Sequence, residues 1–342
     1  MKSANYKPRR VCIAPMLHWT DRHCRYFHRL ITRHTWLYTE MITTGALLYG
    51  SQARHLDFNS EEHPVALQLG GSDPSELARC ARLGEKWGYD EINLNCGCPS
   101  ERVQRGAFGA CLMREPVLVS DCVKAMRDAV SIDVTVKHRI GLDYDYSYEF
   151  VRDFIGEIAE AGCNTFIVHA RSAILKGLSP KENRDVPPLH YDVVYRLKRD
   201  FPGLEIILNG GITTENEIDQ HLVHVDGVMI GRAAYHNPFL LAGFDARYYG
   251  EEATAKSRNE IVLQMVPYID RQLSRQEEGA RHRLKLNGIT RHMLGLVKNE
   301  PGGRRFRQIL SDAKRLATGD SKLLLEALDA LKRKSADSDA ED

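Results

Sequence analysis

The sequence has no apolar run that approaches the ~20 residues of a membrane-spanning helix. Residues 1–10 also lack the apolar stretch that forms the centre of a secretory signal peptide. Without either feature, the sequence predicts a protein that is not membrane-bound, and we expect it in the cytoplasm. Hydrophobic residues make up 43% and charged residues 27% of the chain, which excludes a disordered or fibrous class.

Cysteine is present, but not at the spacing of a metal site. Of the eight cysteines, Cys96 and Cys98 are separated by one residue, and no second Cys or His pair follows at zinc-ligand spacing. Thiols stay reduced in the cytoplasm, so the pattern does not predict a disulfide framework. We therefore expect free thiols and no bound metal.

The sequence has almost no net charge, because 47 Lys and Arg residues balance 46 Asp and Glu to a formal +1. That balance is uneven along the chain. The segment 281–308 contains eight bases and one acid, Glu300, whereas residues 337–342 contain four acids and no base. Basic patches are typical of surfaces that bind phosphate-rich partners, although a solvated helix face has the same composition.

Short apolar runs alternate with helical patterns over about the first 240 residues, which is the usual size of a (β/α)8 or TIM barrel. The predicted strands are 11–16, 36–42, 64–69, 91–95, 134–138, 165–169, 205–209 and 227–230, and the predicted helices between them are 75–87, 117–130, 149–161, 191–200 and 215–223. The second connection, around 45–59, is irregular. A doubly wound α/β sheet is the alternative, but no G-x-G-x-x-G follows the first strand.

Strand patterns stop after Pro238, and only helical patterns follow. The predicted helices are 256–273, 284–297, 304–316 and 322–334. We therefore expect a barrel over 1–245, a small all-α C-terminal domain over 255–334, and a disordered acidic tail over 335–342. We expect the protein to be a monomer.

Cys98 lies just past the strand predicted over 91–95, in the sequence Asn95-Cys96-Gly97-Cys98-Pro99. Gly97 and Pro99 end that strand and hold Cys98 in a turn. Barrels carry their chemistry at this end of their strands. A free cysteine is more often a buried core residue, but the turn favours a reactive thiol here.

Glycines follow the last two predicted strands, in Asn209-Gly210-Gly211 and in Gly231-Arg232. Glycines allow backbone N–H groups to approach an anion, and barrels commonly bind phosphate in these two loops. The Arg232 guanidinium adds a permanent charge. The pattern predicts a phosphate site without distinguishing FMN from a sugar phosphate.

Gln68, Lys137 and His169 end three other predicted strands. Each alone is compatible with an ordinary surface or core role, but together at one barrel mouth they would form a cofactor cradle. Lys137 could stabilise the anionic reduced ring of a flavin. It could instead form a Schiff base, as in barrel aldolases.

Several stretches in chain order resemble the tRNA-dihydrouridine synthases, most closely their A-type bacterial branch. They are 14–25, 91–100, 106–113, 136–139, 168–171, 177–184, 209–211 and 227–232. His18 stands where the A-type pattern has Asp, a difference that concerns a local contact. The resemblance implies an FMN-dependent enzyme that uses NADPH to reduce uridines 20 and 20a of the tRNA D-loop to 5,6-dihydrouridine. Hydride would pass from NADPH to FMN and then to uracil C6, while Cys98 protonates C5.

The same resemblance implies which residues contact FMN and tRNA. Its FMN contacts are Pro15, Met16, Leu17, Gln68, Lys137, His169, Asn209, Gly210, Gly211, Gly231 and Arg232, and its tRNA contacts are Asn95, Lys181 and Arg184. A uracil must leave its stacked loop to reach a flavin at a barrel mouth. The basic segment adds Arg291, Arg304, Arg305 and Arg307 as candidate phosphate contacts.

Two other functions fit part of the pattern. A barrel flavoenzyme could reduce a free pyrimidine-like metabolite, but such a substrate needs no basic helical domain. A barrel could also bind RNA without catalysis, but it would not need Cys98, Lys137, His169 and a phosphate loop together.

Overall fold

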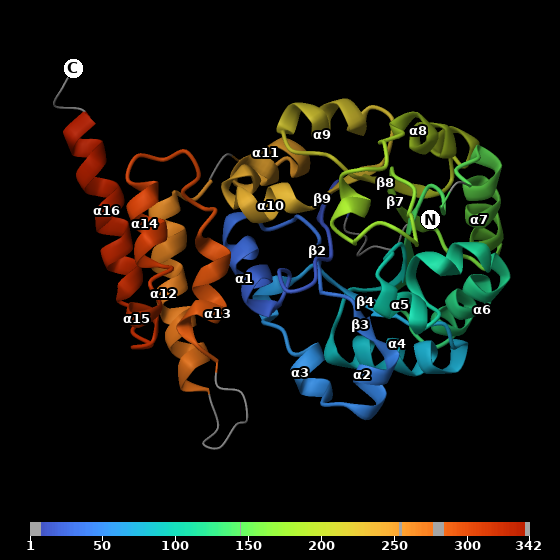
Figure 1. The fold of residues 1–342 in the computed structure, drawn as a ribbon, viewed down its shortest axis with the longest axis horizontal. Helices are drawn as coiled ribbons and strands as arrows, with labels where there is room; N and C mark the ends of the chain where they lie inside the picture. Colours follow the sequence, from blue (N-terminus) through green and yellow to red (C-terminus); the bar gives the residue numbers. More distant parts are fainter. Residues whose placement is uncertain (1–7, 144, 253–254, 276–283, 339–342) are drawn as a thin grey trace. The chain divides into compact units, whose positions relative to one another are not determined.

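The computed structural model describes residues 8–143, 145–252, 255–275 and 284–338. Its centre is a parallel sheet with the strand order β1-β9-β8-β7-β6-β5-β4-β2, and β3 pairs with β4 beside this path (Figure 1). The strands are β1 (Val11–Ile13), β2 (Leu37–Tyr38), β3 (Ile42–Thr43), β4 (Val65–Gly70), β5 (Glu91–Cys96), β6 (Asp133–Arg139), β7 (Thr165–His169), β8 (Glu205–Asn209) and β9 (Gly227–Ile230).

The sheet closes where β1 meets the chain at β2. The N–H of Ile13 donates to the Trp36 carbonyl at 2.8 Å, and the Trp36 N–H donates to the Val11 carbonyl at 3.0 Å. Cys12 and Trp36 form the corresponding parallel bridge. These bonds join the two ends of the strand path, so the predicted TIM barrel is confirmed and the doubly wound alternative is wrong.

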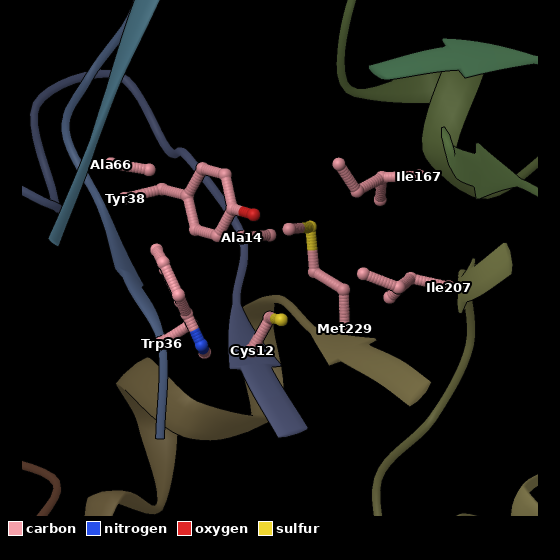
Figure 2. Close-up of a cluster of buried hydrophobic side chains, with 8 residues drawn as sticks. All are labelled: Cys12, Ala14, Trp36, Tyr38, Ala66, Ile167, Ile207 and Met229. Atoms are coloured by element: carbon pink, nitrogen blue, oxygen red, sulfur yellow. The ribbon is translucent and has the colours of Figure 1, made fainter. Parts of the chain in front are cut away.

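Apolar side chains fill the barrel interior. The layer in Figure 2 comes from strands on opposite sides of the barrel, and its side chains point toward one another: Cys12, Ala14, Trp36, Tyr38, Ala66, Ile167, Ile207 and Met229. All eight are buried. Large rings and small alanines alternate in this layer, so the centre of the barrel is a packed core rather than a channel.

Five longer helices between the strands match the predicted ones within a few residues: α4 (Pro74–Trp87), α6 (Pro116–Arg127), α7 (Tyr148–Glu160), α8 (Tyr191–Asp200) and α9 (Glu215–Leu222). Their ends carry ordinary capping signals. Asp73 accepts the Glu76 N–H at 2.8 Å before α4, and Gly88 ends that helix with a φ of +96°. Thr214 and Glu217 form a capping box at α9.

The second connection is the irregular part of the barrel, as the sequence predicts. The strand expected over 36–42 is split into β2 and β3, and both of these pair with β4. Between them the Thr39 hydroxyl accepts the N–H of Gln68 at 3.0 Å, so a side chain replaces a main-chain acceptor. Three short helices follow: α2 (Thr44–Tyr49), α3 (Gln52–Leu56) and η1 (Ser60–Glu62).

The chain forms two compact units, one of Met1–Arg22 and His34–Gly231 and one of His23–Arg33 and Arg232–Asp342. The first unit therefore ends at Gly231, before the boundary at 245 that the sequence predicts. The second unit includes most of α1 (Arg22–Ile31), a helix that the sequence analysis did not predict. Within this unit the Tyr26 ring stacks on Tyr268 at 3.8 Å. The assignment of functions to the two parts stays a prediction.

Helices make up the rest of the second unit. They are α10 (Arg232–His236), η4 (Pro238–Gly243), α11 (Phe244–Tyr249), α12 (Arg258–Ser274), α13 (Leu286–Thr290), η5 (Arg291–Met293), α14 (Gly303–Ile309), α15 (Ala313–Leu316) and α16 (Leu323–Ser338). No helix among the described residues is both long enough and apolar enough to cross a membrane.

Three expectations for this unit need correction. The α-helix predicted over 284–297 stops at Thr290 and continues only as the 3-10 turn η5. The helix predicted over 304–316 is broken, because Asp312 caps α15 by accepting the Lys314 N–H at 2.9 Å. The tail expected to be disordered from 335 is helical through Ser338, and residues 339–342 lie outside the described part.

Candidate active site

Polar residues collect at the carboxyl ends of the barrel strands. Asn95 on β5 is the register partner of Lys137 on β6, and His169 on β7 is the partner of Asn209 on β8. Because parallel strands end at the same face of a barrel, these side chains meet at its mouth. The sequence prediction that they gather there agrees with this register.

The loop that carries Cys98 is fixed through its backbone. The Asn95 side-chain oxygen accepts the N–H of Gly97 at 3.1 Å and of Cys98 at 3.0 Å. The Cys98 carbonyl accepts the Ala110 N–H at 2.9 Å. The thiol itself is partly exposed and lies 3.5 Å from the Ser100 hydroxyl oxygen. The fold therefore holds the main chain of Cys98 and leaves the residue partly exposed.

Gly109, at the start of η2 (Gly109–Arg114), makes this loop possible. Its φ is +77°, and a Cβ at this position would lie 2.4 Å from the Val103 side chain and 2.7 Å from the Cys98 carbonyl oxygen. Only glycine permits both the backbone conformation and the close approach. Val103 belongs to α5 (Glu101–Arg105), which follows the Cys98 turn directly.

Lys137 is a mostly buried cation with a neutral partner. Its Nζ donates to Asn209 Oδ1 at 3.0 Å, and Asn209 Nδ2 donates to the Met229 carbonyl at 2.7 Å. Burial, and then the neighbouring Arg139, lower the Lys137 pKa from 10.5 to about 7, while Cys98 acts in the opposite direction. An anionic group bound beside Lys137 would restore its full charge.

Arg139 joins two loops of the site, a role that the sequence analysis did not assign. It is buried, and its Nε donates to the Gly97 carbonyl at 3.2 Å. One terminal nitrogen donates to the carbonyls of Ser172 at 3.2 Å and Asn183 at 2.9 Å. Burial lowers its pKa to about 10. Arg139 thus ties the Cys98 turn to the loop after β7, and its position two residues after Lys137 on one strand was the available signal.

The loop after β7 is organised by the buried amide of Asn183, a second missed residue. Asn183 Oδ1 accepts the Ile174 N–H at 2.7 Å, and Nδ2 donates to the Ile174 carbonyl at 2.9 Å. The short helix η3 (Glu182–Arg184) contains this asparagine. Lys181 and Arg184 flank it and are exposed, so the buried amide fixes the loop that carries both cations.

His169 lies in an electropositive environment. Burial is the first cause that holds its pKa well below the ordinary value, and the charges of Arg139, Lys137, Arg171 and Arg184 act in the same direction. The imidazole is therefore neutral near pH 7. A mouth lined by one sign of charge attracts anions such as a phosphate.

Gly210 and Gly211 form a turn that demands glycine. Their φ angles are +120° and +75°. A Cβ on Gly210 would lie 2.8 Å from the His169 ring, and one on Gly211 would lie 2.6 Å from the Tyr191 hydroxyl. That hydroxyl donates to the Gly210 carbonyl at 2.9 Å. The turn can therefore bring backbone close to a bound anion, as the sequence predicts.

The loop after β9 has less need of glycine at position 231 than the loop after β8 has at positions 210 and 211. A Cβ on Gly231 would meet only the Ala14 side chain, at 3.9 Å. Arg232 begins α10, which belongs to the second unit. A phosphate role for these two residues stays a prediction.

The loop after β1 contains the predicted contacts Pro15, Met16 and Leu17. Met16 N–H donates to the Thr20 hydroxyl at 3.0 Å, and Leu17 is 67% exposed. His18 has a φ of +64°, and its N–H donates to the Glu40 carboxylate. Histidine and aspartate both populate this left-handed region more often than most residues, so His18 satisfies the backbone that an Asp would.

The basic segment places several charges on the surface of the second unit. In α14 the residues Gly303, Phe306 and Ile309 are buried. The exposed bases of the segment are Lys285, Arg291, Lys298, Arg304, Arg305 and Arg307. Its only acid, Glu300, pairs with Arg258 at 2.8 Å. Arg281 and Arg283 lie outside the described residues.

The cysteines give no metal site in the part of the chain that the structure describes. All eight are free thiols. Cys96 is buried, and burial raises the pKa of its thiol well above the ordinary value. Among the described residues, no group of three His, Cys, Asp or Glu side chains is arranged to hold a metal ion.

A parallel barrel with an accessible thiol, buried cations and a glycine turn at the carboxyl ends of its strands defines a TIM-barrel enzyme. The family model described as dihydrouridine synthase matches residues 12–334. The chain belongs to this family and is an enzyme of it, so the resemblance stated from the sequence is confirmed. The non-catalytic RNA-binding alternative is wrong.

Several relatives are similar over nearly their whole length. A tRNA-dihydrouridine(20/20a) synthase of Pseudomonas aeruginosa is 58% identical over 323 residues, which cover 94% of this chain and 95% of the relative. Proteins with the same name from Synechocystis and Salmonella typhi are 56% and 57% identical, each over 93–94% of this chain and 94% of the relative.

Proposed function

We propose that this enzyme reduces uridines 20 and 20a of the tRNA D-loop to 5,6-dihydrouridine, with FMN as cofactor and NADPH as reductant. The observation that carries this proposal is the accessible Cys98 thiol, fixed beside the cations Lys137 and Arg139 at the barrel mouth. The names of the relatives from Pseudomonas aeruginosa and Synechocystis support the choice of substrate.

The residues at the mouth fit FMN. Gly210 and Gly211 have the left-handed backbone that lets N–H groups approach a phosphate. The other residues proposed to hold FMN are Pro15, Met16, Leu17, Gln68, Lys137, His169, Asn209 and Gly231, with Arg232 as a further candidate. The chemistry that FMN supplies when bound is the transfer of a hydride obtained from NADPH.

Lys137 would provide the positive charge that a reduced flavin ring needs. Burial, and then the charge of Arg139, lower its pKa to about 7, and its Nζ donates to the neutral amide oxygen of Asn209. Negative charge placed beside its Nζ would raise that pKa, so Lys137 would be protonated when the ring is anionic. This role does not require a covalent bond, and it replaces the Schiff-base alternative in our proposal.

Cys98 would complete the reduction by donating its thiol proton to uracil C5. Addition of a hydride at C6 and a proton at C5 converts the C5–C6 double bond to a single bond and leaves the sulfur as a thiolate. Solvent then returns a proton to the sulfur, which is partly exposed. Backbone bonds to Asn95 and Ala110 would keep the thiol aimed during this step.

The flipped uridine would contact residues around the mouth. Asn95 Nδ2 uses one hydrogen for Gln68 Oε1 at 2.9 Å, so its second hydrogen can donate to a uracil carbonyl. Lys181 and Arg184 would bind nearby phosphates from their exposed loop. In the second unit, Arg291, Arg304, Arg305 and Arg307 would bind tRNA phosphates along the basic surface.

An aromatic pair adds a surface suited to an unstacked base. Tyr146, in the loop after β6, is 60% exposed. Its ring is nearly parallel to that of His190, with 6° between the planes and 6.4 Å between the centroids. Single-stranded RNA is commonly bound by stacking on exposed aromatic rings. We therefore propose Tyr146 as a stacking partner for a nucleotide next to the flipped uridine.

The proposal is tested with purified protein, NADPH and tRNA that lacks dihydrouridine. We expect yellow protein with flavin absorbance, and dihydrouridine at positions 20 and 20a by sequencing with a dihydrouridine-sensitive chemistry. Free uridine and free orotate serve as competing substrates. Reduction of a free pyrimidine but not of tRNA would favour a metabolite reductase, and colourless protein that FMN cannot reconstitute would overturn both flavin functions.

A further inference from the structure

A buried ion-pair cluster closes the amino end of the barrel. The Arg9 side chain is 1% exposed and donates to Glu91 at 2.7 Å, Asp133 at 2.7 Å and Glu205 at 2.9 Å. Glu91 is fully buried on β5, the strand that leads to Cys98. One end of β5 therefore carries a buried carboxylate and the other end carries the reactive loop.

Hydrogen bonds connect these two ends through the barrel interior. Thr135 Oγ1 donates to Glu91 Oε1 at 2.6 Å and accepts from Asn93 Nδ2 at 2.8 Å. Asn93 Oδ1 accepts from Gln68 Nε2 at 2.7 Å. Gln68 Oε1 accepts from Asn95 Nδ2 at 2.9 Å. We call the five residues Glu91, Thr135, Asn93, Gln68 and Asn95 the polar column.

The polar column has one direction, which the Glu91 carboxylate sets at one end and the N–H groups of Gly97 and Cys98 require at the other. A carboxylate only accepts, so the single proton of the Thr135 hydroxyl must point to Glu91. The Thr135 oxygen then accepts from the Asn93 NH2 group, which leaves Asn93 Oδ1 as the acceptor for the next amide. The same constraint passes through Gln68 to Asn95. An amide side chain alone could be turned by 180°, but in this column each orientation follows from the one below it.

The final member of the column holds the catalytic loop. Asn95 Oδ1 accepts the N–H groups of Gly97 and Cys98. If the Asn95 amide were reversed, its NH2 group would face these two N–H donors and the loop would lose both bonds. The reversed amide would also present an oxygen, rather than a hydrogen, toward the mouth.

We propose that Glu91 and Thr135 are positioning residues for proton transfer from Cys98, because through the polar column they fix the orientation of the Asn95 amide. This inference rests on the proposed role of Cys98 as proton donor. Neither residue touches the thiol. Their effect passes through the amides of Asn93, Gln68 and Asn95.

The barrel contains a matched arm that lacks this connection. Thr165 Oγ1 donates to Glu205 Oε2 at 2.9 Å, and Glu205 pairs with Arg9 as Glu91 does. Glu205 begins β8, and Asn209 ends it. The Asn209 side-chain amide accepts from Lys137 Nζ and donates to the Met229 carbonyl. Thr165 and Glu205 therefore share the chemistry at the barrel floor without acting on the Cys98 loop.

The test compares Thr135→Val with Thr165→Val in the FMN-loaded protein. Both changes replace a buried hydroxyl with a methyl group of similar size. The first measurement is the rate at which iodoacetamide alkylates Cys98, followed by mass spectrometry of its peptide, which needs no turnover. The others are flavin content, flavin reduction by NADPH, and flavin reoxidation by tRNA.

For Thr135→Val we expect faster Cys98 alkylation, because the loop is released, and tRNA-dependent reoxidation slowed by roughly 10–10²-fold, as for a misplaced reacting group. Reduction of the bound flavin by NADPH should stay within about twofold, since it does not use Cys98. Flavin content should fall somewhat, because Gln68 belongs both to the column and to the proposed FMN contacts, so every rate is measured with saturating FMN and given per bound flavin. Thr165→Val should leave all four measurements near wild type. Thr135→Ser should restore both alkylation and reoxidation. Equal behaviour of the two valine variants would overturn the proposal.

If Thr135→Val does not fold, Glu91→Gln is compared with Glu205→Gln. Both changes remove one charge from the Arg9 cluster, but only Glu91→Gln lets the column reverse. Alkylation that rises in both variants equally contradicts the proposal. The protein could also fail to reduce tRNA while Cys98 alkylation still responds to Thr135→Val and not to Thr165→Val. That result would contradict the proposed reaction and support the role of the column.

Discussion

The two ends of the barrel bury positive charge in opposite ways. At the amino end, Arg9 donates to three carboxylates within 2.9 Å. At the carboxyl end, Lys137 donates to the Asn209 amide oxygen and Arg139 to main-chain carbonyls, so the acceptors of both cations are neutral. The cation at the amino end therefore has anionic partners, whereas the cations at the carboxyl end have only neutral acceptors and would gain from a bound anion.

We infer from this difference that the amino end of the barrel stabilises the fold and that the carboxyl end carries the chemistry. Buried charges with paired partners are costly to disturb because the remaining partner keeps its desolvation penalty. Buried cations without a counter-charge have lowered pKa values, as Lys137 does, and such groups are concentrated at functional sites. Substitutions at the two ends should therefore change different measurements.

The largest expected effect is on catalysis at the mouth. Cys98→Ala should lower tRNA turnover by roughly 10²–10⁴-fold, the typical contribution of a positioned general acid. Flavin content, tRNA binding and reduction by NADPH should remain near wild type, as should the melting temperature. Cys96→Ala is the matched control and should change tRNA turnover only slightly. Normal turnover, or loss of FMN, in Cys98→Ala would make Cys98 a packing residue.

At the floor the effect should be on stability. Arg9→Met should lower the free energy of unfolding by about 3–5 kcal/mol, because Glu91 and Glu205 lose their buried counter-ion. It also removes the guanidinium that lies 4.5 Å from the centre of the Trp36 ring. Urea unfolding of the FMN-free protein measures the change. Arg152→Met, which removes an exposed pair with Asp153, is the control and should leave the free energy of unfolding nearly unchanged.

A third prediction concerns the pH dependence of FMN affinity. The free protein has Lys137 with a pKa of about 7. Oxidised FMN carries its negative charge on the phosphate, and that charge at the barrel mouth raises the Lys137 pKa, so the complex holds more protons than the free protein above pH 7. FMN affinity should consequently fall as pH rises above 7, by up to about tenfold per pH unit. Titration of the FMN-free protein by flavin fluorescence measures this slope, and Lys137→Met should flatten it. An identical slope in both proteins would contradict the assigned charge.

The smallest effects should come from Arg304, Arg305 and Arg307, which are exposed on the second unit. Replacing Arg304, Arg305 and Arg307 with alanine should reduce the log–log salt slope of tRNA binding by ~0.7–0.9 for each phosphate that the variant no longer binds. Flavin reduction by NADPH should not change. The charge-matched control removes Arg79, Lys86 and Arg199 from the outer helices of the barrel. Unchanged affinity and slope would show that the α14 charges are only a solvated face.

Sequence patterns predicted the barrel because its strands and outer helices carry strong local signals. β7 and β8 are short runs of buried apolar residues, and α8 begins and ends where the helical period predicts. Helix α1 was missed because its apolar stripe of Cys24, Phe27 and Ile31 lies among polar residues that are also buried, among them His23, Arg25 and His28. Its partners lie far away in the sequence, as the 2.7 Å bond between His23 and Tyr268 shows.

For the site, sequence reasoning identified residues but not their connections. Cys98, Lys137 and Gly210 stand out because each follows a strand or ends one. Arg139 and Thr135 act through bonds to other strands, and no spacing along the chain encodes those bonds. The direction of the Asn95 amide is set by the N–H groups of Gly97 and Cys98 on one side and by the column that begins at Glu91 on the other, and neither set of bonds is visible in the sequence.

The closure of the barrel also has a consequence for its biosynthesis. Strand β1 pairs with β9 through Val11 and Val228, two residues from opposite ends of the barrel sequence. At the usual rates of translation, ~10–40 s pass between the appearance of these two strands from the ribosome. During that interval one side of the nascent β1 has no strand to pair with, and an unpaired strand edge is a template for aggregation. The order of the strands thus leaves one edge of the nascent barrel without its partner until the last strand emerges.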